Sequence, residues 1–152
     1  MSRNFFAAIV VVSLLLIQST ASADYPKYLN GDRNYIMFDG HLGDGRYIVR
    51  NSLRVEADNY PYLRLSIDWV VVPRAYYGST EIVGGRQSFH LAYDRNARKI
   101  YHVNPQTGDE HYLPRNVSRT GGSSAMYAAE MAFYLVTGEK FYGFSDEFYP
   151  DR

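Results

Sequence analysis

Three histidines in the second half of the chain are the residues whose type and spacing best suit chemistry. His90 and His102 lie in two alternating segments that resemble the arms of a hairpin. If a three-residue loop joins the arms, these two imidazoles face each other, and His111, beside Glu110, can join them from the next segment. Three imidazoles and a carboxylate suit zinc, so the pattern allows a metal-assisted hydrolase. No H-E-x-x-H motif or close His-x-His pair supports it, and half-exposed strand histidines are the alternative interpretation.

Two other polar stretches fall short of a catalytic or ligand-binding motif. The segment 39–44 has carboxylates and glycines, but it lacks the alternating acidic ligands and the distal Glu of an EF-hand loop and favours a turn. Ser123 and Ser124 follow two glycines without forming G-x-S-x-G, and they are typical of a helix cap. No glycine motif for phosphates or dinucleotides is present. We therefore favour a non-enzymatic function and expect no cofactor.

The segment that must position most of these residues is a strand predicted over residues 62–72. Apolar side chains occupy every odd position from Leu63 to Val71, and polar ones alternate with them as far as Asp68. This period of two is typical of a half-buried antiparallel strand. Val70 and Val72 interrupt the polar face, so we expect that end of the strand to be covered on both sides.

Shorter strands and one helix complete the predicted fold. The sequence predicts a helix from Ser123 or Ser124 to Thr137, ended by Gly138, with Glu130 as its one charge. Such an apolar helix must be buried, most simply across one face of a sheet. The remaining strands are predicted over residues 35–38, 45–50, 53–57, 86–93, 99–103 and 111–113. The expected class is α+β, an antiparallel, meander-like sheet of five to seven strands with one apolar C-terminal helix packed on a face.

Residues 1–23 have the pattern of a secretory signal peptide. Arg3 precedes a run of thirteen residues, Phe5 to Ile17, that is apolar except for one serine, and Ala21-Ser22-Ala23 resembles a cleavage site. Cleavage would leave residues 24–152 as a single α+β domain with no membrane insertion. Since the chain has no cysteine, it has no site for a lipid anchor at the cleavage point. We expect a soluble protein in the periplasm or outside the cell.

Charge and aromatic content bear on the partner. The 152-residue chain has 16 basic and 16 acidic residues with no long run of one sign, which disfavours nucleic acid. Its 15 tyrosines favour strands and also contact surfaces. We select Tyr60, Tyr76, Tyr77 and Tyr142, on predicted loops, as candidate binding residues; packing is the alternative for each.

The order of segments resembles the surface-adhesin protein E-like family of small exported bacterial proteins. The resemblance rests on residues 63–72, on Ala92-Tyr93-Asp94 through Lys99-Ile100-Tyr101, and on residues 128–142. It implies a small β-rich exported protein with a C-terminal helix, and attachment to host matrix proteins. We therefore predict an exported, non-enzymatic, adhesin-like binding module of the bacterial envelope, with a protein or envelope component as ligand. The alternatives are the histidine-based hydrolase and an envelope assembly or inhibitor subunit.

Overall fold

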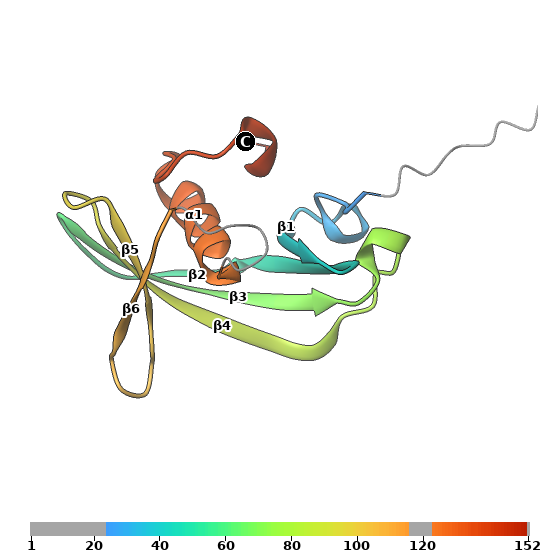
Figure 1. The fold of residues 1–152 in the computed structure, drawn as a ribbon, viewed down its shortest axis with the longest axis horizontal. Helices are drawn as coiled ribbons and strands as arrows, with labels where there is room; N and C mark the ends of the chain where they lie inside the picture. The colour runs from blue at the N-terminus through green and yellow to red at the C-terminus, as the bar shows by residue number, and fades with distance from the viewer. Residues whose placement is uncertain (1–23, 116–122, 152) are drawn as a thin grey trace, which may run out of the picture.

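A computed structural model describes residues 24–115 and 123–151 (Figure 1), so the predicted signal peptide lies outside the described residues. Six strands form one antiparallel sheet in the order β1 to β6, and one helix, α1, packs against it. This confirms the α+β class and the predicted meander. The elements are η1 (Leu29–Gly31), β1 (Tyr35–His41), β2 (Asp44–Asn59), β3 (Tyr62–Val72), η2 (Ala75–Tyr77), β4 (Val83–Asp94), β5 (Lys99–Val103), β6 (Glu110–Leu113), α1 (Ser124–Thr137) and η3 (Asp146–Phe148).

The turn expected over residues 39–44 is wrong, because most of this segment belongs to the two strands of a hairpin. Strand β1 runs to His41 and β2 starts at Asp44, which leaves only Leu42 and Gly43 between them. Both have positive φ, 51° and 91°, which is the backbone that a tight two-residue hairpin turn requires.

Strand β2 is one strand of 16 residues where we expected two. The register of its pairing with β3 shifts between Val49 and Arg54. At this interruption the hydroxyl of Ser52 takes the place of a backbone hydrogen-bond partner. This hydroxyl donates to the Val49 carbonyl at 2.6 Å and accepts from the Asp68 N–H at 2.8 Å. The side chain therefore satisfies polar groups that the ladder leaves unpaired.

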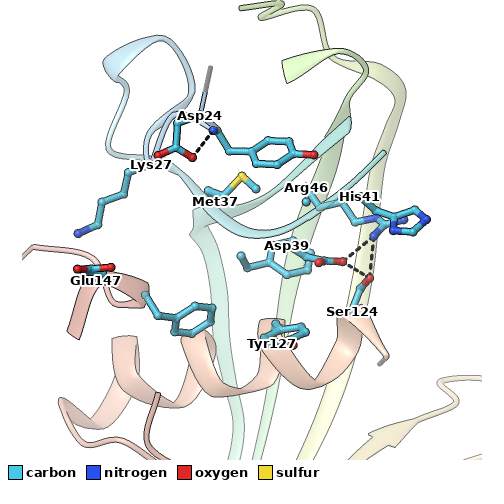
Figure 2. Close-up of a pocket in the computed structure, with 13 residues that line it drawn as sticks. Asp24, Lys27, Met37, Asp39, His41, Arg46, Ser124, Tyr127 and Glu147 are labelled. Carbon is cyan, nitrogen blue, oxygen red and sulfur yellow. Dashed lines mark hydrogen bonds and ion pairs between the residues drawn. The ribbon is translucent and has the colours of Figure 1, made fainter. Parts of the chain in front are cut away.

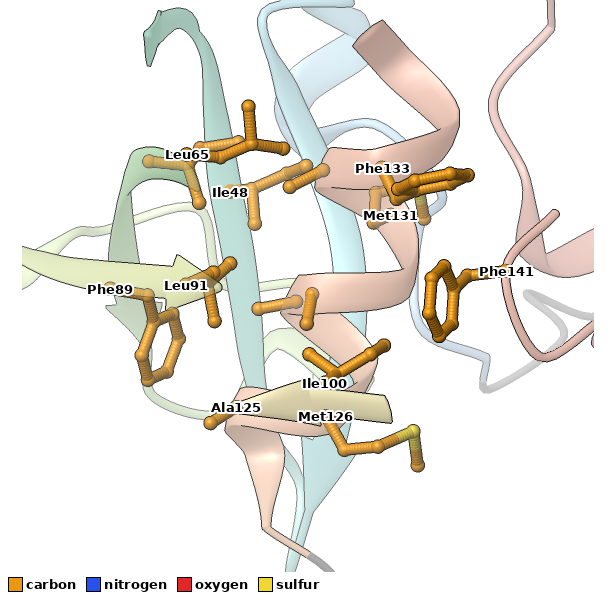
Figure 3. Packing of buried hydrophobic residues seen from close by; sticks show 14 of the residues in the cluster. Ile48, Leu65, Phe89, Leu91, Ile100, Ala125, Met126, Met131, Phe133 and Phe141 are labelled. Atoms are coloured by element: carbon orange, nitrogen blue, oxygen red, sulfur yellow. The ribbon is translucent and has the colours of Figure 1, made fainter. Parts of the chain in front are cut away.

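The face of the sheet that α1 covers, called the inner face from here on, contains the main core (Figure 3). Alternate residues of β3, from Leu63 to Ile67, are almost fully buried there together with residues 125, 126, 128, 129 and 131–133 of α1. The Tyr93 hydroxyl donates to the Ala129 carbonyl at 2.8 Å, which ties β4 to the helix. Gly138 ends α1 with a φ of 74°, as predicted, because glycine accepts this left-handed conformation without strain.

The opposite or outer face has its own smaller core at one end of the sheet. Val70 and Val72 are buried there with Tyr47 beneath Leu29 of the N-terminal segment, which confirms that this end of β3 is covered on both sides. Burial, and then the nearby Tyr25 hydroxyl, raise the pKa of Tyr47 to about 12. The Tyr47 hydroxyl has no hydrogen-bond partner among the described residues.

Within residues 24–115 and 123–151, no helix has the length and apolarity needed to cross a membrane.

Candidate functional site

One candidate site is a pocket of about 880 Å³ between strand β1 and the first turns of α1 (Figure 2). The N-terminal residues 24–27 and the short helix η3 complete its wall. A volume between about 300 and 1,000 Å³ is usual for small-ligand pockets, which combine apolar walls with a few placed polar groups. We call this site the β1–α1 pocket.

A β-bulge in β1 places Asp39 at the polar centre of the pocket. Met37 pairs with Tyr47, and Asp39 pairs with Arg46, so that Phe38 is an extra residue in β1. A bulge of this kind puts two consecutive side chains on one face of a sheet. Phe38 is therefore buried on the inner face, and Asp39 also points toward α1.

Asp39, Arg46 and Ser124 form a closed hydrogen-bonded triangle at the start of α1. Arg46 Nη1 donates to Asp39 Oδ2 at 2.6 Å and to Ser124 Oγ at 2.9 Å, and Ser124 Oγ donates to Asp39 Oδ2 at 2.5 Å. Asp39 and Arg46 are mostly buried, with 19% and 29% of their side chains exposed. Three mutually bonded side chains on three elements hold this end of the pocket in one arrangement.

This triangle corrects our assignment of the two serines. Ser123 occupies the N-cap position but makes no side-chain capping bond. Ser124 uses its hydroxyl for Asp39 instead, and the carboxylate lies near the helix N-terminus, where negative charge is favourable.

Aromatic rings form the apolar wall of the pocket. Tyr127 of α1 lies 6.2 Å from Phe148 of η3, ring centre to ring centre, and both line the cavity with Phe38 and Tyr25. Gly40 lets the wall close, because a Cβ atom there would lie 2.7 Å from the Tyr25 ring. The pocket thus has aromatic rings from α1, η3, β1 and the N-terminal segment around a fixed polar group.

The cations of the pocket already have partners. Arg46 is paired with Asp39, and Lys27 Nζ lies 3.2 Å from Asp151 Oδ1. By contrast, Asp24 and Glu147 line the pocket without an ion pair to any described residue. The uncompensated charge of the site is therefore negative.

The predicted pairing of His90 with His102 is wrong. Strand β5 pairs His102 with Leu91, because a turn of four residues, 95–98, joins β4 to β5 where we expected three. One extra residue shifts the register by one and moves a side chain to the other face of the sheet. His90 lies on the outer face, with Nδ1 3.1 Å from Glu56 Oε1, whereas His102 lies on the inner face beside Phe89.

Only two of the three histidines come together. His111 lies opposite His102 in the β5–β6 ladder. Burial, then the charges of His111 and His90, lower the pKa of His102 from 6.5. Among the described residues no group of three or more His, Cys, Asp or Glu side chains is arranged to hold a metal ion.

The four selected tyrosines lie in three different places. Tyr60, 72% exposed, precedes β3 and donates to Asn96 Oδ1 at 2.7 Å. Tyr76 and Tyr77 follow the other end of β3, where Tyr77 is 70% exposed and Tyr76 packs between Tyr77 and Tyr25. These tyrosines therefore form no common surface, although Tyr25 connects Tyr76 to the wall of the β1–α1 pocket.

Tyr142 is half-buried and packs against the main core. Its hydroxyl donates to the Leu113 carbonyl at 2.8 Å, and its backbone N–H donates to Glu130. Burial, and then the neighbouring Tyr112, raise the pKa of Tyr142 to about 12.

The residues that build the β1–α1 pocket were not found from the sequence. Asp39 was considered only within a possible calcium loop, and Arg46 and Tyr127 were not singled out. The three members of the triangle become neighbours only through the β1 bulge and the packing of α1, and neither leaves a local sequence pattern.

Comparison of the chain with protein-family models, curated proteins and solved structures finds no match in any of the three.

Proposed function

We propose that this chain is an exported, non-enzymatic binding module of the bacterial envelope, and that the β1–α1 pocket is its ligand site. The observation that supports this best is the pocket itself: about 880 Å³, walled by aromatic rings around the fixed Asp39–Arg46–Ser124 triangle. A preorganised site of this kind binds without reorganising, which keeps the entropic cost of binding low.

The charges of the pocket favour a ligand with a cationic group on an apolar body. Arg46 and Lys27 are matched by acidic partners, whereas Glu147 is available to a ligand. In a chain that begins at Asp24, the terminal ammonium group compensates the carboxylate of that residue. The faces of Tyr127 and Phe148 attract cations through their ring quadrupoles. We infer an organic cation, either free or as the side chain of a protein partner.

The remaining predictions about function are supported to different degrees. The hydrolase alternative stays a prediction with less support than before, since His90 lies on the opposite face from His102 and His111. An envelope assembly or inhibitor subunit differs from the proposed module only in its partner. Adhesin-like attachment and the family resemblance stay predictions.

Calorimetric titration of residues 24–152 with three small probes tests the pocket. Agmatine supplies a guanidinium and an ammonium group, choline a quaternary ammonium group, and benzoate an aromatic anion. We expect agmatine or choline to bind with a dissociation constant of about 1 mM or lower, and benzoate to bind more weakly.

Two variants locate the binding, and one serves as control. Tyr127→Ala removes a ring and should weaken cation binding about three- to tenfold, and Glu147→Gln removes an exposed charge and should weaken it about twofold. Glu81→Gln makes the same change at an exposed residue outside the pocket and should have no effect. Tighter binding of benzoate than of both cations, or equal binding by all variants, contradicts the proposed site.

Export is tested separately with a reporter. Residues 1–30 fused to an alkaline phosphatase without its own signal should give active, exported enzyme in a Gram-negative host, and Leu15→Arg in the apolar run should abolish it. N-terminal sequencing of the exported full chain should begin at Asp24. An inactive fusion, or a chain that retains residues 1–23, contradicts the export prediction.

A further inference from the structure

The outer face of the sheet carries a second surface, formed by a row of side chains in register across four strands. Arg64 of β3 pairs with Ala92 of β4, Ala92 with Tyr101 of β5, and Tyr101 with Tyr112 of β6. Paired residues of an antiparallel sheet point to the same face, so all four lie on one side. The rings of Tyr101 and Tyr112 are 5.8 Å apart between centres, and Tyr112 is 49% exposed.

A polar groove of about 500 Å³ lies next to this row. It includes Arg54, Ser66 and His90, which are paired in register across β2, β3 and β4. A second bulge in β2, between Val55 and Ala57, brings Glu56 to the same face, where its Oε1 lies 3.1 Å from His90 Nδ1. His90 and Tyr101 are diagonal neighbours on adjacent strands, about 7–8 Å apart by sheet geometry, so the groove and the rings are continuous.

The charges of this surface nearly balance, with the two cations Arg54 and Arg64 against the three carboxylates of Glu56, Asp68 and Glu110. Arg64 Nη2 bridges to Glu110 Oε1 at 2.8 Å, and Arg54 lines the groove together with Glu56 and Asp68. Both members of the Arg64–Glu110 bridge are well exposed, so their pairing is weak and a ligand can replace it at little cost. A surface with many donors and acceptors but little net charge selects a neutral polar ligand over an anion or a cation.

We infer that this outer surface, the residues Tyr101 and Tyr112 with the groove around Glu56, Ser66 and His90, binds a neutral oligosaccharide. A pyranose ring has C–H groups on its faces and hydroxyls around its rim. Tyrosine faces therefore contact the apolar side of a sugar, while carboxylates, guanidinium groups, imidazoles and serine hydroxyls take its hydroxyls. The site is separate from the β1–α1 pocket, and its occupation does not depend on the proposed cation.

Titration of ¹⁵N-labelled residues 24–152 with neutral trisaccharides, followed by NMR, tests this inference. Chitotriose, cellotriose and maltotriose differ in substituent and linkage, so they also indicate which glycan type fits. We expect at least one of them to shift the amides of β4, β5 and β6 with a dissociation constant of about 1 mM or lower. No saturable shift with any of the three at 10 times that concentration overturns the inference, as does tighter binding of tetraalanine at the same amides.

Alanine variants distinguish a real site from weak surface contact. Tyr112→Ala, or Tyr101→Ala if the first variant folds poorly, should weaken binding about three- to tenfold, and Glu56→Gln should weaken it without removing a ring. Tyr77→Ala, the matched control, removes an exposed tyrosine at the other end of β3 and should leave binding unchanged. Equal affinities of the wild-type protein and all of these variants overturn the inference.

Discussion

At the scale of single residues, Glu130 shows how one buried charge organises the C-terminal segment. This carboxylate is fully buried in α1 and accepts the backbone N–H groups of Phe141, Tyr142 and Gly143 at 2.9, 2.8 and 3.3 Å. It also accepts the Tyr149 hydroxyl at 2.6 Å. The helix, predicted to be apolar with one charge, therefore uses that charge to fold the chain that follows it.

Replacement of Glu130 by glutamine should reduce the free energy of unfolding by about 2–4 kcal/mol. The amide keeps one acceptor oxygen but presents an NH₂ group to donors that need an acceptor, and each hydrogen bond to a charged group contributes about 1.5–3 kcal/mol. Urea denaturation measures the loss. Glu139→Gln, an exposed change just after the helix, is the control, and equal stabilities of the two variants would sink this account.

His102 is expected to titrate at a lower pH than an exposed histidine. Burial, then the charges of His111 and His90, lower its pKa below 6.5, so the folded state binds fewer protons than the unfolded state near that pH. Its contribution to stability is complete above pH 6.5 and is lost as the pH falls through 6.5 to the folded-state pKa. An NMR titration of the imidazole checks this, and a pKa at or above 6.5 contradicts it.

At the scale of elements, strand periodicity predicted most of the sheet but not its register. The pattern of β3 and the bounds of β5 were clear from alternation, and α1 from its apolar run and its glycine. The bulges at Phe38 and Glu56 and the four-residue turn after β4 decide which face each polar side chain occupies. Such irregularities depend on pairing with a partner strand, so alternation within one segment does not reveal them.

The Asp39–Arg46–Ser124 triangle should couple strand β1 to helix α1 energetically. Asp39→Ala leaves Arg46 without its partner and should reduce the free energy of unfolding by about 1–3 kcal/mol. Ser124→Ala alone should cost less, and the double variant should cost less than the two changes added together. A double-mutant cycle by urea denaturation measures this coupling, and strictly additive losses would show that the three side chains act independently.

At the scale of the whole molecule, the sheet is covered on both faces at one end. Helix α1 packs on the inner face, and residues 24–33 cover Tyr47, Val70 and Val72 on the outer face. Asp151 joins the two ends of the described chain, because it pairs with Lys27 and Tyr28 of the N-terminal segment. The sequence indicated this second layer through the valines of β3, but not which segment provides it.

Removal of residues 24–33 should therefore destabilise the protein strongly. The deletion exposes Tyr47, Val70 and Val72, and each fully buried apolar side chain contributes about 1.5–3 kcal/mol, so we expect a loss of at least about 3 kcal/mol. Urea denaturation and binding of a hydrophobic dye measure it. Unchanged stability and no added dye binding would show that the N-terminal segment is not part of the core.

The measurement that tests the central claim most directly is a ¹H–¹⁵N NMR titration of residues 24–152 with agmatine, because it reports binding and its place together. The pocket predicts saturable shifts at Phe38 to His41, at Ser124 to Tyr127 and near Phe148, with little change at the far end of the sheet around Tyr60. The indole N–H of Trp69, whose ring lies 6.1 Å from that of Phe38, should also shift. No saturable shift at these residues, or shifts confined to other parts of the chain, would contradict the assignment of this pocket as the ligand site.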